Sequence, residues 1–409
     1  MLIAGEASGD LLAAELAFAL FAASKQSEDG GAPQFFGAGG AKMAAAGIEL
    51  AFDLTQHSVV GFSDVVKNYF KFRRLFKQLL ALAIERKPDV VIGVDFGGFN
   101  LRFGYAVKRY IRDNPFSKWN PKIVQFVSPQ VWASRPGRAD LLAEDYDLLL
   151  SIFPFEKDWY AKRVPGFRVE FVGHPMIGRF TNDNLRFARR EPAVRGSRGR
   201  EAQIKENTDK VEPPHVGCHE STVLLLPGSR KSELQRHLPV MIGAMKLIRK
   251  ELPSAKAKMV LPDKELKALA NSLFALPANL KIETGNLSQA LAAADAAIAS
   301  TGTVTMECAF FGVPAVTLYK TSWLNYQIAK RIATVKWATM PNILANDEVF
   351  PEFIQNAATP ENIAHAALEL LRNEPRRQLI KSQLSEIVSS LGEPGAAGRA
   401  AAAILSLFK

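Results

Sequence analysis

The chain has 409 residues, enough for two or three domains, and 48% of them are hydrophobic, which indicates globular cores and excludes a disordered chain. Its formal net charge of +10 favours anionic partners, namely phosphorylated ligands, anionic lipid or nucleic acid. Nucleic acid is the weaker choice because aromatic-plus-basic RNA-binding signatures are missing. The two cysteines, Cys218 and Cys308, form neither a disulfide framework nor a metal cluster, which fits a reducing compartment.

No apolar run approaches the roughly 20 residues of a membrane-spanning helix. Near the N-terminus, Glu6 and Asp10 fall where the uninterrupted apolar core of a signal peptide would lie. We therefore expect a cytoplasmic protein.

A short predicted strand, residues 1–4, runs directly into the loop Gly5-Glu6-Ala7-Ser8-Gly9-Asp10. Its glycines permit close backbone approach. Glu6 and Asp10 place carboxylates at the start of a predicted helix, where they also serve as ordinary caps. The loop lacks the Gly-Lys-Ser/Thr of a phosphate-binding P-loop, and Ser8 is misplaced for a nucleophile elbow. After the second strand, Lys42 stands where a dinucleotide fingerprint needs a third glycine, so a nicotinamide cofactor is unsupported.

Residues 62–86 predict a helix that is both apolar and basic. One interpretation places its bulky side chains in an anionic membrane surface. The alternative is a core-facing helix whose Lys and Arg remain solvated. We favour the membrane interpretation for Tyr69 to Phe76 and the core interpretation for the second half.

Asp95 ends the apolar run 90–94, which reads as a buried parallel strand. At this position its carboxylate points into the ligand-binding edge of a sheet, where a general base would stand, although it can instead cap the next helix. Further predicted strands, 123–127, 148–153 and 167–172, continue the strand–helix alternation of one doubly wound domain. His174, just beyond, is expected to anchor the crossover backbone rather than to act in catalysis.

Residues 186–220 are polar, lack periodicity and read as an insertion. The apolar run 223–226 then stops at Pro227-Gly228-Ser229-Arg230, and helical spacing of apolar residues begins at Ser232. A helix start with free N–H groups and the charge of Arg230 suit an anion such as a diphosphate. A plain turn whose Arg caps a carboxylate is an equal alternative.

A second anion-ready helix start follows the strand 296–299, at Thr301, Gly302 and Thr303. Glu307 lies about one turn into this helix, where a carboxylate could accept two ribose hydroxyls or simply favour the helix start. Strands are also expected at 258–261, 281–283 and 314–319, a proline-pinned loop at 340–344, and two closing helices at about 375–390 and 397–408.

Seven short motifs along nearly the whole chain resemble those of the lipid-A-disaccharide synthase family, in the family's order. They are Ala4 to Asp10, Val127 to Ala133, Pro154 to Lys157, Gly173 to Pro175, Leu226 to Arg230, Gly302 to Cys308, and Pro341-Asn342. Each motif is weak alone, and together they are specific.

The resemblance implies an α/β enzyme of the GT-B type, glycosyltransferase family 19, with two Rossmann-like doubly wound domains facing across a cleft. The expected domains are 1–172, facing acceptor and membrane; 173–372, binding the UDP-sugar; and 373–409, two helices that pack back on the first domain. The implied reaction moves 2,3-diacylglucosamine from its UDP conjugate to 2,3-diacylglucosamine 1-phosphate (lipid X), giving a β-1′,6-linked disaccharide phosphate and UDP. No metal or other cofactor is implied.

The resemblance also assigns roles to residues. Asp95 matches the carboxylate proposed to deprotonate the acceptor, and Glu6 an acidic position in the same domain. Arg230 and Asn342 match positions needed for activity or UDP binding, and Glu307 the donor-ribose position. The implied setting is the cytoplasmic face of the inner membrane, with peripheral attachment and a possible homo-oligomer. The competing interpretations are another GT-B enzyme, such as a UDP-GlcNAc 2-epimerase, and a non-catalytic nucleotide-binding protein of the membrane surface.

Overall fold

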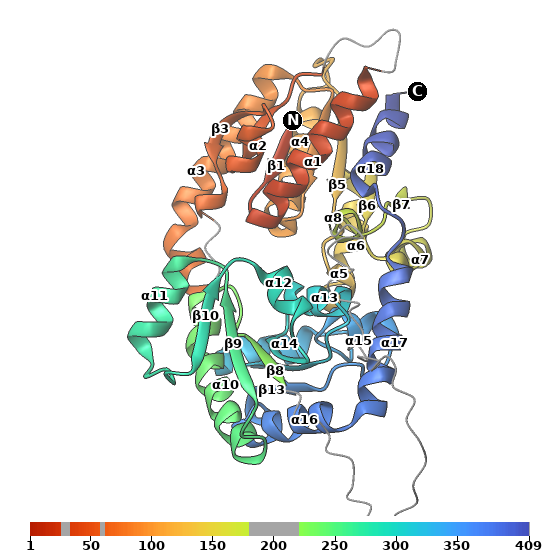
Figure 1. Cartoon of the computed structure of the whole chain (residues 1–409). Coiled ribbons are helices and arrows are strands. Elements are labelled where there is room, and N and C mark those ends of the chain that lie inside the picture. The colour runs from red at the N-terminus through yellow and green to blue at the C-terminus, as the bar shows by residue number, and fades with distance from the viewer. Residues whose placement is uncertain (26–32, 58–61, 180–220, 409) are drawn as a thin grey trace, which may run out of the picture. The chain divides into compact units, whose positions relative to one another are not determined.

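The computed structural model of the chain describes residues 1–25, 33–57, 62–179 and 221–408, apart from the side chains of residues 57 and 62–69. These residues form two compact units (Figure 1). Of the described residues, those in 1–179, 327–336 and 388–408 form unit 1, and those in 221–326 and 337–387 form unit 2. The chain thus divides at 179 rather than 172, and its closing segment joins unit 1 from 388 rather than 373. The expected insertion at 186–220 lies outside the described residues.

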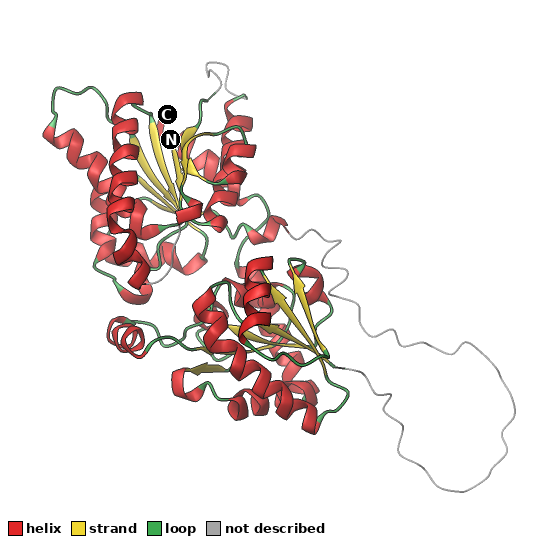
Figure 2. Ribbon diagram, turned by 90° about the vertical axis from the view of Figure 1, so that its left-hand side faces the viewer, coloured by secondary structure: helices red, strands yellow, loops and turns green. Residues whose placement is uncertain are grey.

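Unit 1 is built on a parallel seven-stranded sheet in the order β3-β2-β1-β4-β5-β6-β7. Helices lie on both sides of the sheet (Figure 2). Its strands are β1 (Leu2–Ala4), β2 (Phe36–Gly39), β3 (Glu49–Asp53), β4 (Val90–Val94), β5 (Lys122–Phe126), β6 (Leu148–Ser151) and β7 (Val169–Phe171). Its helices are α1 (Ala7–Ser24), α2 (Ala41–Ala45), α3 (Phe62–Arg86), α4 (Gly97–Asp113), α5 (Val131–Ser134), α6 (Arg138–Asp145), α7 (Pro154–Arg163), α8 (Met176–Arg179) and α18 (Ala396–Leu405).

Unit 2 repeats the plan with six parallel strands in the order β10-β9-β8-β11-β12-β13. The strands are β8 (Thr222–Leu226), β9 (Lys256–Leu261), β10 (Leu280–Thr284), β11 (Ala296–Ser300), β12 (Ala315–Tyr319) and β13 (Glu352–Ile354). The helices are α10 (Lys231–Glu251), α11 (Lys264–Leu273), α12 (Leu287–Ala292), α13 (Thr303–Phe310), α15 (Met340–Ala345) and α16 (Pro360–Arg372). Two more helices, α14 (Trp323–Ile332) and α17 (Glu374–Ser390), each contribute residues to both units.

The apolar runs form the central strands because both faces of a parallel sheet are covered. Strands β4, β5 and β8 are almost wholly buried. In each sheet the strand order reverses direction once, between β1 and β4 and between β8 and β11. Loops leave such a switch point in opposite directions, and open α/β sheets bind their ligands there. The fold therefore brings the Gly5–Asp10 loop beside Asp95, and the Pro227–Arg230 loop beside Thr301.

Helix α1 is the one described helix long and apolar enough, by length and composition, to cross a membrane. It lies near the N-terminus and 44% of it is buried inside the structure. It packs beside α18 (Figure 1) and against β1, as core helices of the same composition do. The sequence predicts no apolar run of membrane-spanning length, and α1 differs from that prediction by length and composition alone.

Helix α3 corrects part of the membrane interpretation. Phe72 and Phe76 lie within the proposed membrane stretch, yet both pack against the core of unit 1. The Phe76 ring meets the rings of Phe99 and Phe103 at centroid distances of 5.3 and 5.6 Å. Phe70, in contrast, is 78% exposed. The side chain of Tyr69 lies outside the described residues.

Candidate functional site

The switch point of unit 1 brings Ser8 and Asp95 together. β1 and β4 pair in parallel, with Ala4 opposite Val94, so the loops that follow them start side by side. Ser8 Oγ donates a hydrogen bond to Asp95 Oδ2 at 3.2 Å. Gly5 permits this approach, since a Cβ there would lie 2.2 Å from the Phe96 ring. Ser8 fits no nucleophile motif and its partner lies 87 residues away, so no local sequence signal pairs the two residues.

The backbone at Asp95 has a strained conformation that hydrogen bonds hold in place. Asp95 and Phe96 have φ angles of 52° and 46°, in the left-handed region that non-glycine residues rarely adopt. The Asp95 carbonyl accepts hydrogen bonds from Asn100 Nδ2 at 2.8 Å and from Gln125 Nε2 at 2.9 Å. Both amide side chains are buried. They fix the direction in which the Asp95 carboxylate leaves the strand.

The environment of Asp95 changes its acidity. Burial raises the pKa of this carboxyl above its ordinary value, and hydrogen bonds from the Phe96 amide and the Ser8 hydroxyl partly oppose the rise. A general base works best when its pKa lies near the working pH. The half-buried carboxylate is therefore more basic than an exposed aspartate, which suits the role predicted for it.

Ser8→Ala should move the acidic limb of the pH profile of kcat/KM to higher pH. The Ser8 hydroxyl lowers the pKa of Asp95, so its removal raises that pKa further and leaves less ionised base at a given acidic pH. The pH profile of initial rates measures the effect, with Ser24→Ala on the same helix as the control. An unshifted limb would contradict the assignment of that limb to Asp95.

Glu6 and Asp10 have different places in this loop. Glu6 is half-buried at the N-cap of α1, and its carbonyl accepts the Asp10 amide at 2.9 Å. Asp10 was expected to cap its own helix, but its buried carboxylate accepts from the amides of Gly40, Lys42 and Met43 at 2.7–3.1 Å. It therefore caps α2 and ties the loop to the neighbouring strand.

A buried acid, Glu156, lies behind the loop that follows β5. It is fully buried and accepts hydrogen bonds from Trp132 Nε1 at 2.9 Å and from the Phe153 amide at 3.3 Å. Burial raises its pKa from 4.5 to about 7. The Trp132 bond fixes α5 against α7, so Glu156 positions the segment beyond β5 in the middle of the sheet.

The stability of the protein should depend on pH through Glu156. Its folded-state pKa lies above its unfolded value, so its contribution is complete below about pH 4.5 and is lost as the pH rises through about 7. At 1.36 kcal/mol per pKa unit, the wild type should lose about 3 kcal/mol over this range relative to Glu156→Gln. Urea unfolding of both proteins at several pH values measures this difference. Parallel stability curves would contradict it.

His174 anchors the crossover, as expected. Its Nδ1 accepts from the Met176 amide at 3.2 Å, and its own amide donates to the Leu391 carbonyl at 2.8 Å. Burial, with a smaller effect of Arg179, lowers its pKa to about 4, so the ring is neutral near pH 7. It joins the end of the first Rossmann-like segment to the closing segment of unit 1.

In unit 2, the Pro227–Arg230 loop leaves β8 where Leu226 pairs with Ala299 of β11. Gly228 has φ 113°, a value that a side chain would disfavour. The Ser229 amide donates to Glu233 Oε2 and Arg230 Nη1 to Glu233 Oε1, both at 3.2 Å. The alternative in which Arg230 meets a carboxylate is therefore the arrangement seen. The Ser229 amide and the Arg230 guanidinium are thus both engaged by one carboxylate of the adjoining helix, and the anion site predicted for this loop stays a prediction.

His237 fixes this loop, a role that sequence reasoning missed. It is fully buried, its Nε2 accepts the Lys320 amide at 3.0 Å, and its Nδ1 lies 2.8 Å from the Pro227 carbonyl. Because Nε2 is an acceptor, Nδ1 carries the proton and donates to Pro227. Burial lowers the pKa of His237, which keeps the ring neutral. The only sequence signal was a histidine among the apolar positions of α10.

The second loop of unit 2 predicted to bind an anion lies at the start of α13. Gly302 and Thr303 are exposed there, Thr301 is half-buried, and Thr305 Oγ1 donates to the Gly302 carbonyl at 2.7 Å. Glu307 is half-buried one turn further along. Because β8 and β11 are neighbours in the sheet, these residues and the Pro227–Arg230 loop share one switch point.

Asn342 lies buried inside unit 2. The proline-pinned loop is helix α15, since Pro341 stands in its first turn, where proline is tolerated. Asn342 is fully buried: its Oδ1 accepts from the amides of Val349 and Phe350, and its Nδ2 donates to the Phe350 carbonyl and to Glu352 Oε1, at 2.7–3.0 Å. Its amide is thus engaged inside unit 2. These bonds join α15 to Glu352 of β13 and to the segment before it, and the predicted role of Asn342 in activity or UDP binding stays a prediction.

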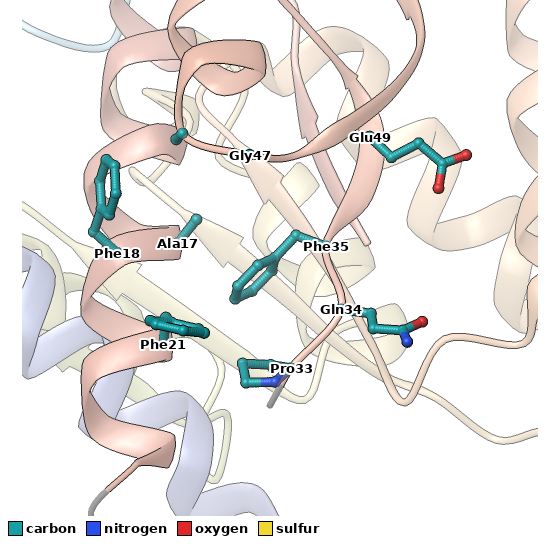
Figure 3. Close-up of a pocket in the computed structure, with 9 residues that line it drawn as sticks. Ala17, Phe18, Phe21, Pro33, Gln34, Phe35, Gly47 and Glu49 are labelled. Carbon is teal, nitrogen blue, oxygen red and sulfur yellow. The ribbon is translucent and has the colours of Figure 1, made fainter. Parts of the chain in front are cut away.

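One hollow lies away from these loops. It measures about 620 Å³ and is lined by Phe18 and Phe21 of α1 and by Phe35 (Figure 3). Phe35 and Gly47, which also lines it, precede β2 and β3. The hollow therefore lies toward the amino ends of the parallel strands, opposite the edge that carries Asp95.

The two sheets and their loops define the structural class of the protein. Two doubly wound parallel sheets, each with functional loops at its switch point, are the architecture of GT-B glycosyltransferases and of the related UDP-GlcNAc 2-epimerases. The fold resembles a glycotransferase of kitacinnamycin (TM-score 0.54, 18% identity, 98% and 97% of the two chains). It also resembles a UDP-GlcNAc 2-epimerase from Neisseria meningitidis (TM-score 0.51, 11% identity, 97% and 96%). At these identities the likeness shows the fold alone.

The comparison of sequences goes further. A family model described as lipid-A-disaccharide synthetase matches residues 1–197 and 199–406. Proteins named lipid-A-disaccharide synthase from Syntrophus aciditrophicus (34% identity) and Myxococcus xanthus (32% identity) align over 100% of this chain and 97% of their own length. The chain belongs to the lipid-A-disaccharide synthase family, and is a glycosyltransferase of lipid A biosynthesis that takes a UDP-sugar donor and an acceptor.

Proposed function

We propose that the enzyme transfers 2,3-diacylglucosamine from UDP-2,3-diacylglucosamine to the 6-hydroxyl of 2,3-diacylglucosamine 1-phosphate. The acceptor oxygen attacks C1 of the donor sugar and loses its proton to the Asp95 carboxylate. The bond from C1 to the diphosphate oxygen breaks, and its electron pair leaves with UDP. Attack opposite the leaving group inverts the anomeric centre and gives the β-1′,6 linkage.

The observation that carries this proposal is the pair of functional switch points. In unit 1, a strained and hydrogen-bonded Asp95 has its pKa raised by burial, as a base requires. In unit 2, the Ser229 amide and Arg230 already hold a carboxylate, Glu233. We assign the donor diphosphate to this second loop and to the start of α13, with Glu307 toward the ribose. The diphosphate replaces Glu233 as the partner of Arg230.

We further propose that no metal takes part. The charge of the leaving UDP is met by backbone N–H groups, the α13 helix start and Arg230. Within the described ranges, no group of three or more His, Cys, Asp or Glu side chains gathers that could hold an ion.

Turnover should therefore persist when the enzyme is assayed in excess EDTA. The guanidinium and helix ends, unlike a bound metal ion, are not removed by a chelator. The rate of UDP release with and without EDTA gives the answer. Loss of turnover in EDTA, restored by Mg²⁺ or Mn²⁺, would contradict the metal-free mechanism.

The direct test of the reaction is product analysis with purified protein. Incubation with the acylated donor and lipid X should yield a disaccharide phosphate of the expected mass, and NMR of its anomeric proton should show a β linkage. Unacylated UDP-GlcNAc should react negligibly. Conversion of UDP-GlcNAc to its 2-epimer would support the competing epimerase function instead, and UDP binding without any product would support a non-catalytic protein.

Because both substrates carry acyl chains, we propose that the enzyme works at the cytoplasmic face of the inner membrane as a peripheral protein. The net charge of +10 and the exposed ring of Phe70 on basic helix α3 support such a setting. Whether the chain forms a homo-oligomer is tested by the molar mass of the protein in solution.

A further inference from the structure

Helix α14 leaves its apolar side chains uncovered. None of its ten residues, all of which are described, is buried. Trp323, Leu324 and Ile328 are 72%, 60% and 42% exposed. A helix of this length is marginal in water, and helices in proteins draw most of their stability from packing an apolar face.

The exposed side chains share one face with basic residues. At about 100° per residue, Trp323, Leu324 and Ile328 fall within an arc of about 140°. Arg331 falls inside this arc and Lys330 about 20° beyond its edge. Both cations stand in the last turn of the helix. Lys and Arg beside Trp and aliphatic side chains can bury their aliphatic stems with them while their charged heads reach the level of the lipid headgroups.

The segments flanking α14 are fixed on both sides. Before it, the Thr321 amide donates to Gln355 Oε1 at 2.8 Å, and the Thr321 carbonyl accepts from Gln355 Nε2 at 3.1 Å. After it, Thr334 donates through its amide to the Ala133 carbonyl at 2.9 Å and through its hydroxyl to the Trp132 carbonyl at 2.5 Å. Each flanking segment is therefore held within its own unit, and the apolar side chains of the helix between them are exposed.

We propose that α14 docks on a lipid bilayer that contains anionic lipid, with Trp323, Leu324 and Ile328 in the interface and Lys330 and Arg331 among the headgroups. Charge favours this occupant over a second copy of the chain. A symmetric contact between two copies would bring the same patch against itself, cations included, in a protein of net charge +10. This surface rests on the membrane association proposed above and adds α14 to it. Vesicle binding tests it without any measurement of enzymatic turnover.

The experiment measures co-sedimentation of the full chain with vesicles of three parts phosphatidylethanolamine to one part phosphatidylglycerol. Trp323→Glu combined with Leu324→Glu should weaken binding at least tenfold. Leu379→Glu is the matched control, because Leu379 is 61% exposed on α17, almost as Leu324 is on α14. Lys330→Gln with Arg331→Gln should weaken binding to these vesicles but not to pure phosphatidylcholine. Unchanged UDP affinity shows that each variant is folded.

A second readout locates the helix itself. Brominated lipids quench indoles that enter the bilayer interface, so wild-type fluorescence should fall on vesicle binding. Trp323→Phe should sediment as the wild type does and lose most of that quenching. The proposal is overturned if the double Glu variant sediments normally, or if Trp323→Phe leaves the quenching unchanged. It is equally overturned if the double variant alters only the oligomeric state, which would make the face an interface between copies.

Discussion

Asp95→Asn should reduce kcat by about 10²- to 10⁴-fold, the usual contribution of a positioned general base, and leave the affinity for UDP unchanged. Asn is the informative substitution because it tolerates the left-handed backbone found at φ 52°, whereas Ala would add strain to the loss of the carboxylate. Its amide cannot accept the acceptor's proton. Single-turnover rates and UDP titrations separate the two effects.

The control for this prediction is Asp113→Asn at the other end of α4. Asp113 is an exposed carboxylate that pairs with Arg109 at 3.5 Å, so its loss should leave the rate unchanged. Wild-type turnover in Asp95→Asn would remove Asp95 from the mechanism. Equal loss of turnover and UDP affinity would instead indicate a folding defect or a nucleotide site in unit 1.

Arg230→Ala should lower kcat by about 10²- to 10³-fold, as the removal of one donor to a developing oxyanion does in other enzymes, and should weaken UDP binding as well. The guanidinium is 44% exposed and 3.2 Å from Glu233, so it is accessible to a diphosphate that displaces this carboxylate. Arg230→Lys should restore only part of the activity, because an ammonium cannot make the paired contacts of a guanidinium.

Arg236→Ala, on the same helix, is the matched control. Its guanidinium bonds the Ser232 carbonyl of its own helix at 3.3 Å and has no role in the proposed mechanism. Both variants lose one positive charge, so a general electrostatic effect would weaken UDP binding equally in the two. A fall confined to Arg230→Ala supports a specific contact, and an unaffected Arg230→Ala would contradict the donor site.

The sequence alone located the loops because their signals are local. An apolar run that ends in Pro-Gly or in Asp beside glycines marks the carboxyl end of a buried strand. The strand–helix alternation of residues 1–172 predicted one doubly wound domain, and the family resemblance implied the second. Asp95 and Arg230 both follow strands of this kind, and the structure places each at a switch point. The pattern could not show the order of the strands in the sheet. That order places the Gly5–Asp10 loop beside Asp95.

The residues that sequence reasoning missed act over long separations. Ser8 bonds Asp95 across 87 residues, and His237 bonds the Lys320 amide across 83. Asp10 caps α2, a helix 31 residues along, rather than its own. The hydrophobic periodicity of a sequence does not reveal such long-range pairs. Pro341 misled for a different reason, since proline breaks helices in their interior but is accommodated in their first turn.

The membrane interpretation of α3 shows the limit of composition. Alternating apolar and basic residues are compatible with a lipid surface and equally with a core-facing helix. In the structure, Phe72 and Phe76 contact the core of unit 1, whereas Phe70 is exposed. Helix α14 is the opposite case. Its short apolar stripe gives no clear signal in the sequence, yet none of its residues is buried in the structure.

A crystal structure of the enzyme soaked with UDP tests the central assignment most directly. The pyrophosphate should lie against the Ser229 amide and the Arg230 guanidinium, with Glu233 displaced, and the ribose should face Glu307 at the start of α13. A nucleotide seated instead at the Gly5–Asp10 loop of unit 1, or one that leaves the Arg230–Glu233 pair intact, would contradict the account.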